Sequence, residues 1–397
     1  MLEEKCYKMN DIIVFGDDFH NTYGVIRSLG EEGVHPYFIN VNTGDFSFVE
    51  KSKYIKKCWR VDSASQGIRV LLANFKELTD KPVIICTSDK TIHEIDIHYD
   101  ELKQWFILPH INAKQGEISR LMKKDVMRNY AKDVGFDLTN SVTIDLRELE
   151  CIDLNSINFP CLVKPTTSLE GSKNDISVCL NKEELKESLR AVSQNASEVE
   201  VQDYIRKDVE LLLMGCVLRS GEVIMPLYLL KTREDPKLEG STAWALCKST
   251  YPGFDIRKVY EFVKRIGYYG IFSLEYLVKG DKHYFLEINL RNDGNGYAPT
   301  YGGVNLPYIW ALDAMGADVS EYKRKIEKDF YAQVELTDYG YLKCKPYRIL
   351  RWLIDAFKTE CFYVANKQDP KPWEELLCQE RFFVRPFHRL LYKFLVR

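Results

Sequence analysis

The chain has 397 residues, of which 45% are hydrophobic, and this is enough for about two or three domains with buried cores. Its 22 glycines and 14 prolines are too few for a collagen-like or low-complexity protein. A formal net charge of −3 provides no overall attraction for nucleic acid, so we expect no nucleic-acid partner.

Cysteine usage and apolar runs bear on the cellular compartment. The 11 cysteines include no Cys-x-x-Cys pair and have no histidine at metal-ligand spacing, which indicates reduced thiols. Residues 1–8 are charged and lack the apolar core of a signal peptide, and no run reaches the ~18 apolar residues of a spanning helix. We therefore expect a cytoplasmic protein.

The first part of the chain predicts an α/β unit with a parallel sheet. An amphipathic stretch over 23–32 predicts a helix. Short apolar runs predict strands over 11–15, 34–41, 82–86 and 105–108. The turn over 16–20 is no Gly-x-Gly-x-x-Gly, so it gives little support to a dinucleotide site. We expect a sheet whose edge serves another domain.

The middle of the chain predicts an α+β region. A charged helix is predicted over 117–135 and ends with Gly135 in the C′ position. Lys164 lies at the end of an apolar strand, before the polar loop 167–173. A further helix is predicted over 182–194. Antiparallel strands are predicted over 176–180, 200–205, 209–214 and 223–230.

A hairpin follows, with strands over 271–278 and 283–289 joined by the turn Lys279-Gly-Asp-Lys282. Pairing about this turn places Glu275 opposite Glu287. Two like charges that face each other across a ladder are destabilising unless a cation lies between them. The pair is therefore a candidate metal site, although a solvent-facing strand edge with unrelated acids is an alternative that spacing leaves open.

Two more residues continue the alternation of this strand. Asn289 falls on the same face as Glu287, and Arg291 follows beside it. Three oxygen donors on one face suit Mg²⁺, with Mn²⁺ as a substitute, and an arginine suits a phosphate or carboxylate oxygen. The Gly-rich polar segment 292–303 predicts a loop that faces substrate. Within it, Asp293 and Tyr297 are candidate bases that can equally be structural.

Three motifs in this order and separation resemble the ATP-grasp ligases. They are Val-Lys-Pro at 163–165, Val-Gln-Asp-Tyr-Ile at 201–205 and Glu-Ile-Asn-Leu-Arg at 287–291. The chain looks most similar to carboxylate–amine ligases related to D-aspartate ligase, and more loosely to carbamoyl-phosphate synthase and biotin carboxylase.

The resemblance implies a fold of mixed α/β and α+β class in three parts. A Rossmann-like pre-ATP-grasp domain would occupy 1–115. A two-lobed ATP-grasp domain with a hinge near 200–206 would occupy 116–316, and a C-terminal helical extension would occupy 317–397.

The resemblance also implies roles for individual residues. Arg291 and Lys164 would be catalytic, and Glu275, Glu287 and Asn289 would bind the metal. The residues that would contact ATP are Lys124, Lys164, Ser168, Gly171, Ser172, Gln202, Asp203, Tyr204, Ile205, Glu210, Lys231 and Leu286. Lys123 competes with Lys124, and a solvated helix face is the alternative for either lysine.

The implied activity is ATP-dependent ligation of a carboxylate to an amine through an acylphosphate, with release of ADP and phosphate. The expected cofactors are ATP and Mg²⁺, and the expected substrates are small carboxylates and amines, with cell-envelope precursors as one class. Some amino-acid ligases carry an arginine where this chain has Ser273, so the group that stabilises the tetrahedral intermediate is undetermined. The alternatives are a carboxylate–thiol ligase, a carboxylase of the same fold, or a non-catalytic ATP-binding protein; a homodimer is frequent among relatives.

The end of the chain is basic and amphipathic. Residues 381–397 contain no acid and carry Arg381, Arg385, Arg389, Lys393 and Arg397. Four-residue spacing places these charges on one helical face, which predicts peripheral contact with an anionic membrane at the inner face. A helix docked on the protein with its basic face in water is the alternative and the more common arrangement.

Overall fold

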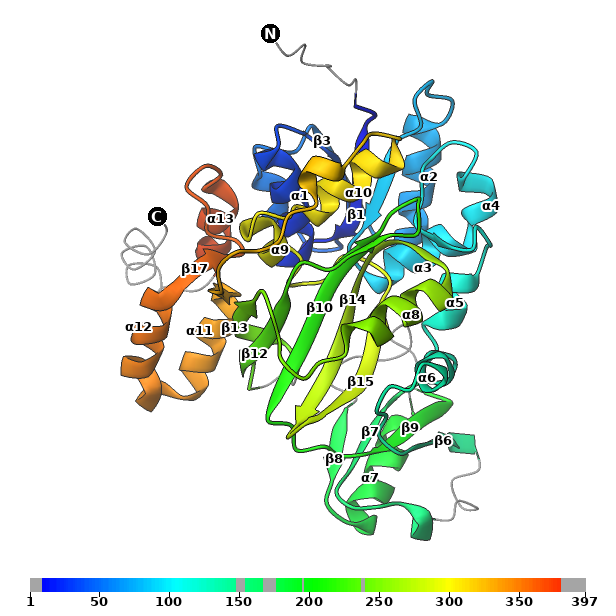
Figure 1. The fold of residues 1–397 in the computed structure, drawn as a ribbon, viewed down its shortest axis with the longest axis vertical. Helices are drawn as coiled ribbons and strands as arrows, with labels where there is room; N and C mark the ends of the chain where they lie inside the picture. The colour runs from blue at the N-terminus through cyan, green and yellow to red at the C-terminus, as the bar shows by residue number, and fades with distance from the viewer. Residues whose placement is uncertain (1–8, 148–153, 167–175, 195, 237–239, 380–397) are drawn as a thin grey trace.

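The computed structural model describes residues 9–147, 154–166, 176–194, 196–236 and 240–379. Three sheets organise these residues. A parallel sheet lies at one end, a small antiparallel sheet projects at the other, and a large sheet joins them (Figure 1). Among the described helices, none is long and apolar enough to cross a membrane.

The N-terminal sheet is parallel, as predicted, with the order β3-β2-β1-β4. Its strands are β1 (Ile12–Asp17), β2 (Tyr37–Val41), β3 (Lys57–Val61) and β4 (Val83–Cys86). Its helices are α1 (His20–Glu31), α2 (Ala64–Phe75), α3 (Asp89–Ile97) and α4 (Tyr99–Leu102). Alternate residues of β1 enter two cores, with Val14 in one and Ile13 and Phe15 in the other.

Two details of this unit differ from the sequence prediction. β3 was not expected, because charged residues at the sheet edge hide its apolar pattern. The predicted strand 105–108 is wrong: of these residues, only Ile107 forms a bridge, to Val83.

The predicted helix 117–135 is two helices, α5 (Glu117–Leu121) and α6 (Lys124–Asp133). The helix breaks because Lys123 has extended backbone angles, φ −70° and ψ 127°. As predicted, Gly135 lies just beyond the end of α6 with a φ of +73°. The break places Lys124 in the first turn of a helix.

The small sheet is antiparallel, with the order β6-β9-β7-β8 and its own apolar core. Its strands are β6 (Ser141–Asp145), β7 (Cys161–Pro165), β8 (Ser177–Cys179) and β9 (Glu198–Asp203), and α7 (Lys182–Val192) packs on it. We call this unit the small lobe. Figure 1 shows it projecting from the central sheet.

The central sheet has nine strands, with β15-β14-β10-β12-β13-β16-β17 as its path. β11 also pairs with β10, and β5 pairs with β14. The strands are β5 (His110–Ile111), β10 (Val209–Val217), β11 (Val223–Ile224), β12 (Tyr228–Glu234), β13 (Thr242–Lys248), β14 (Tyr268–Lys279), β15 (Lys282–Asn289), β16 (Phe330–Gln333) and β17 (Thr359–Phe362). The single strand predicted over 223–230 is therefore two strands.

The remaining described helices pack partly on the central sheet and partly on the N-terminal unit. They are α8 (Ile256–Ile266), α9 (Tyr297–Tyr301), α10 (Leu306–Ala314), α11 (Glu335–Cys344), α12 (Ile349–Lys358) and α13 (Lys371–Gln379). Among the described residues, 3₁₀ turns lie at Val49–Lys51, Leu154–Ser156, Ser320–Tyr322 and Pro346–Arg348. The residues beyond 316 thus contain helices, as predicted, and also add β16 and β17 to the sheet.

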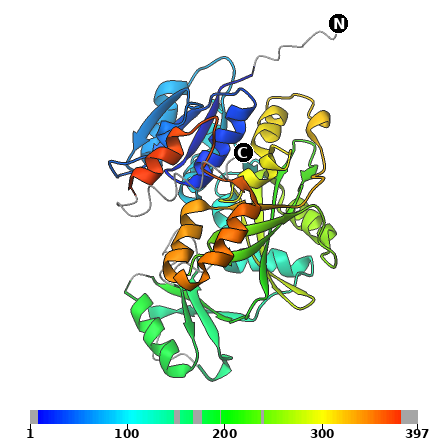
Figure 2. The same ribbon diagram turned by 90° about the vertical axis from the view of Figure 1, so that its left-hand side faces the viewer.

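A buried ionic network attaches α11 and α12 to the central sheet. Arg233 of β12 donates from Nη2 to Asp338 Oδ2 of α11 at 3.0 Å and from Nη1 to Asp355 Oδ2 of α12 at 2.9 Å. All three side chains are less than a tenth exposed. Figure 2 shows these two helices side by side.

We predict that Asp338→Ala lowers the free energy of unfolding by about 3–5 kcal/mol, because it leaves a buried guanidinium short of a partner. The exposed pair of Lys248 and Asp329, 3.4 Å apart, provides the control. Asp329→Ala should cost at most about 1 kcal/mol. Urea denaturation of both variants measures how much free energy of unfolding each one loses. Equal losses would contradict the stabilising role of the buried ionic network.

Candidate active site

The hairpin of β14 and β15 places Glu275 opposite Glu287, as predicted. The turn has two residues, Gly280 and Asp281, and Lys279 pairs with Lys282. Simple counting from this turn would place Leu286 opposite Glu275. The register shifts after Glu275, so Leu286 is the extra residue of a β-bulge. The bulge is thus what brings the two acids face to face.

Asn289 completes this face. It pairs with Ser273, and its Nδ2 donates to Glu275 Oε1 at 3.2 Å. Burial raises the pKa of Glu275, and the charges of Glu287 and Glu210 add to the rise, while Lys231 opposes it. We call Glu275, Glu287 and Asn289 the acidic face.

The acidic face fits a divalent cation in the chemistry of its donors. Two carboxylates and an amide are hard oxygen ligands, and a cation between facing acids would relieve their repulsion. Within the described residues, no group of three or more His, Cys, Asp or Glu side chains is placed to hold a metal. A cation here would therefore draw its remaining ligands from water or substrate.

Lys231 of β12 joins the acidic face to a second buried acid. Its Nζ contacts Glu210 Oε1 directly, lies 3.1 Å from Glu275 Oε2, and donates to Gly240 O at 2.7 Å. Glu210 also accepts from Lys207 Nζ at 2.6 Å. Burial favours a neutral Glu210, but Lys231 and Lys207 outweigh it and hold the pKa of Glu210 well below its usual value. Glu210, expected at the ribose hydroxyls, is therefore engaged in ion pairs.

Lys124 and Lys164 lie near each other between the small lobe and the acidic face. Lys164 Nζ is 3.2 Å from Glu200 Oε2, and the backbone N–H of Lys124 donates to Thr166 O at 3.3 Å. Burial lowers the pKa of Lys124 to about 8, and Lys164 adds to this, whereas Glu287 and Glu200 oppose it. Lys123 is exposed, so the geometry favours Lys124 over Lys123.

Arg291 is fixed by the N-terminal unit. Its Nε donates to Asp89 Oδ1 at 2.8 Å, and its Nη2 donates to Asn289 Oδ1 at 3.3 Å. Burial disfavours the charge, but Asp89 and Asp293 outweigh it and raise the pKa of Arg291. The guanidinium is therefore charged and held beside the acidic face. Asp89 starts α3, directly after β4, so the edge of the parallel sheet contributes to this site, as expected.

Several of these groups line one cavity of about 700 Å³. The predicted residues that line it are Lys124, Lys231, Glu275, Glu287, Asn289 and Arg291. Lys164, Gln202, Asp203, Tyr204, Ile205, Glu210 and Leu286 are not among its lining residues. Ser168, Gly171 and Ser172 lie outside the described residues.

The predicted hinge residues lie where the small lobe meets the central sheet. Asp203 ends β9 and accepts from Asn140 Nδ2 at 2.7 Å, and the N–H of Tyr204 donates to Pro160 O at 3.0 Å. Gln202 is buried within β9, and Ile205 belongs to the short connection from β9 to β10. This position suits a hinge, whereas contact with adenine stays a prediction.

The segment 292–303 is more buried than a substrate loop would be, and it contains α9. Asn292 Nδ2 donates to Asn21 Oδ1 at 2.5 Å, which ties the segment to α1. Tyr297 donates to Glu31 at 3.0 Å and is not a lining residue of the cavity, so it is structural. Asp293 does line the cavity, where it accepts two hydrogen bonds from Asn295.

Sequence reasoning missed several residues of the N-terminal unit that line the cavity, including Asp17 and His20. Burial lowers the pKa of His20 to about 4, against the opposing charge of Asp293, so its ring is neutral at physiological pH. Their position just after the first predicted strand is the signal that could have identified these residues, because ligands of parallel α/β sheets bind beyond the carboxyl ends of the strands.

Comparison with known proteins places this architecture among characterised enzymes. No family model matches the chain. It is 24% identical over 235 residues to the formate-dependent phosphoribosylglycinamide formyltransferase of a Nitratiruptor species, covering 57% of each protein. It is 23% identical over 338 residues to the D-aspartate ligase of Enterococcus faecium, covering 81% of this chain and 76% of that protein.

A solved structure shares the fold. The biotin carboxylase domain dimer of Hydrogenobacter thermophilus 2-oxoglutarate carboxylase, a complex with MgADP, ADP and bicarbonate, superposes with a TM-score of 0.61 at 17% identity. The match covers 80% of this chain and 73% of that one. The match to the formyltransferase spans only a little over half of that relative's length.

We predict that Lys231→Met lowers the free energy of unfolding at about pH 7 by about 3–5 kcal/mol, because two buried carboxylates lose a shared cation. Lys207→Met is the matched control and should cost less, because Glu210 keeps Lys231. Urea denaturation measures both, and equal losses would contradict the central role of Lys231.

The pH dependence has a definite sign. A carboxyl group whose pKa is depressed on folding contributes stability above its ordinary pKa, 4.5 for Glu210, and loses it as the pH falls. Acid therefore destabilises the wild type through Glu210. The deficit of Lys231→Met should narrow as the pH falls, first through the raised pKa of Glu275, where protonation removes an uncompensated charge, and then below about pH 4.5, where the wild type loses the contribution of Glu210. A deficit that stays constant with pH would contradict this explanation.

Proposed function

We propose that this chain, which belongs to the ATP-grasp superfamily, is an ATP-dependent carboxylate–amine ligase that proceeds through an acylphosphate and releases ADP and phosphate. The observation that carries the proposal is the convergence of the acidic face with Arg291, Lys124 and Lys231 on one cavity. The likeness to D-aspartate ligase over most of both chains supports it.

The chemistry begins with charge repulsion. A substrate carboxylate must approach the γ-phosphate of ATP, and two anions repel each other unless nearby cations neutralise them. Mg²⁺ bound at the acidic face, with Mn²⁺ as a substitute, supplies part of this neutralisation and orients the phosphates. The residues of the chain supply the rest.

Arg291 is placed to bind an oxygen of the carboxylate or of the transferring phosphoryl group. Asp89 and Asn289 hold its guanidinium in place, so little orientational freedom is lost when an oxyanion binds. Lys124, which lines the cavity, would neutralise phosphate charge, and that charge would raise its depressed pKa. Lys164, now paired with Glu200, would join it when the lobes close. In this proposal 1–115, 116–316 and 317–397 are the three domains, and the lobes close about the hinge near 200–206.

We predict that the wild type releases ADP when a suitable carboxylate and amine are both present, and that Glu287→Gln lowers this rate at least about a hundredfold by removing a metal ligand. A panel of amino acids and amines, assayed for ADP, makes the measurement. The panel starts with cell-envelope precursors as the proposed substrate class. Hydroxylamine added as the acceptor should trap the acylphosphate as a hydroxamate.

Asp281→Asn, in the turn of the same hairpin, is the matched control and should keep full activity. Glu287→Gln should fold at least as stably as the wild type, because it removes one of two facing charges. Activity that survives Glu287→Gln would overturn the metal assignment. Activity with a thiol in place of the amine would favour the carboxylate–thiol ligase, and activity with bicarbonate in place of the carboxylate would favour the carboxylase.

We also propose that the chain forms a homodimer. We further propose that residues 381–397 make peripheral contact with an anionic membrane. These residues lie outside the described part of the chain. The support for the contact is their five cations and absence of acids. Deletion of 380–397 should abolish sedimentation with vesicles of anionic lipid and leave ADP release unchanged. Unchanged sedimentation would contradict the contact, and vesicles of neutral lipid are the control.

A further inference from the structure

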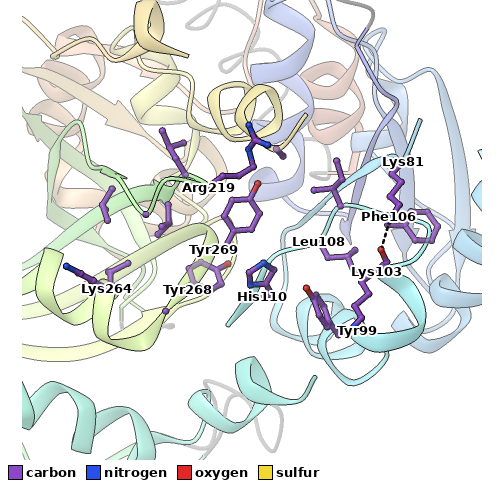
Figure 3. Close-up of a pocket in the computed structure, with 18 residues that line it drawn as sticks. Lys81, Tyr99, Lys103, Phe106, Leu108, His110, Arg219, Lys264, Tyr268 and Tyr269 are labelled. Carbon is purple, nitrogen blue, oxygen red and sulfur yellow. Dashed lines mark hydrogen bonds between the residues drawn. The ribbon is translucent and has the colours of Figure 1, made fainter. Parts of the chain in front are cut away.

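A second cavity, of about 500 Å³, lies where the N-terminal unit meets the central sheet. One side is formed by residues between 81 and 110, and the other by the β10–β11 turn, the end of α8 and the start of β14 (Figure 3). It shares no lining residue with the cavity of the candidate active site. Its volume falls within the range of about 300–1,000 Å³ that small-molecule sites occupy.

The charged side chains that line this second cavity are all cations, and two of them pair with acids behind the lining. Its described lining includes Lys81, Lys103, Arg219 and Lys264, and no Asp or Glu. Lys103 is paired with Asp100 at 2.6 Å, and Arg219 Nε lies 3.9 Å from Asp313.

Lys81 donates to the carbonyl of Lys103, and Lys264 adds a further cation to the lining. The local potential therefore favours an anion and disfavours a cation.

Aromatic rings form the middle of the cavity. The His110 ring lies 5.1 Å from that of Tyr269 and 5.7 Å from that of Tyr99, measured between centroids. Figure 3 shows His110 between the two tyrosines. The N–H of Ala113 donates to His110 Nδ1 at 3.1 Å, and burial lowers the pKa of His110, so the neutral ring carries its proton on Nε2.

One polar group lacks a partner. The Tyr269 hydroxyl is buried and makes no hydrogen bond to any described residue. Such a group costs free energy unless a partner is supplied. Figure 3 shows this hydroxyl turned toward Arg219, which is 55% exposed and so able to reorient toward a ligand. A donor hydroxyl beside a guanidinium suits an oxyanion.

We propose that this second cavity binds a small aromatic anion, with its ring against His110 and Tyr269 and its phosphate or carboxylate group at Arg219 and the Tyr269 hydroxyl. The proposal does not depend on the ligase activity, because none of these residues lines the active-site cavity. A ligand here contacts both the N-terminal unit and the central sheet, so it should stabilise the folded chain by mass action.

Phenyl phosphate is the probe, titrated into the full chain by calorimetry in the presence of saturating ATP and Mg²⁺. We expect saturable binding of one molecule per chain, which ATP does not displace and Glu287→Gln does not alter. Inorganic phosphate should bind more weakly, because it lacks the ring, and benzylamine should not bind.

Arg219→Gln should weaken the binding of phenyl phosphate by about tenfold or more, and Tyr269→Phe by several-fold. Arg265→Gln is the matched control, since Arg265 neighbours Lys264 on α8, pairs with Asp133 at 2.9 Å and does not line the cavity. Thermal melts of each variant establish that it is folded.

The proposal is overturned if phenyl phosphate shows no saturable binding, if ATP displaces it, or if benzylamine binds equally well. It is also overturned if folded Arg219→Gln binds like the wild type, or if Arg265→Gln weakens binding as much as Arg219→Gln does. Equal binding of inorganic phosphate and phenyl phosphate would overturn the aromatic part of the assignment.

Discussion

The candidate active site depends on one buried cation, the ammonium group of Lys231. Lys231 pairs in register with Glu210 on the neighbouring strand and also reaches Glu275, one strand further on. Two buried carboxylates without a cation would be protonated or would destabilise the fold. Lys231 neutralises part of this charge and leaves Glu287 facing Glu275, so the site keeps an excess of negative charge of the kind that a divalent cation offsets.

The local parts of this arrangement are predictable from sequence. The turn signal at Gly280 and Asp281 identified the hairpin, and alternation identified the face that holds Glu275, Glu287 and Asn289. The β-bulge at Leu286 was not predictable, although the register depends on it, because no residue type marks the position. The predicted pairing of Glu275 with Glu287 is therefore correct. The residue counting behind that prediction did not include the bulge residue Leu286.

The sequence pattern could not predict contacts between residues far apart in the chain. Arg291 is anchored by Asp89, 202 residues away, and nothing in either segment predicts the other. Likewise, Asp96 caps α5 by accepting from the N–H groups of Ile118 and Ser119. At the break after Lys123, the N–H of Lys124 donates to Thr166 O at 3.3 Å, so the predicted single helix forms two helices. Tertiary hydrogen bonds outweighed the local preference in each case.

One strand, β14, connects both cavities. Its first residues, Tyr268 and Tyr269, pair with β5 of the segment that follows the N-terminal unit, and Tyr269 lines the second cavity. Further along, Glu275 lines the active-site cavity, where Asp89 of the N-terminal unit fixes Arg291. The N-terminal unit therefore positions Arg291 near this same end of β14, because Asn289 pairs with Ser273 and the Tyr268 hydroxyl donates to Leu290 O at 2.8 Å. A rigid-body shift of that unit would change the width of the second cavity and the place of Arg291 together, because the unit contributes Tyr99 and Lys103 to one cavity and Asp17 and Asp89 to the other.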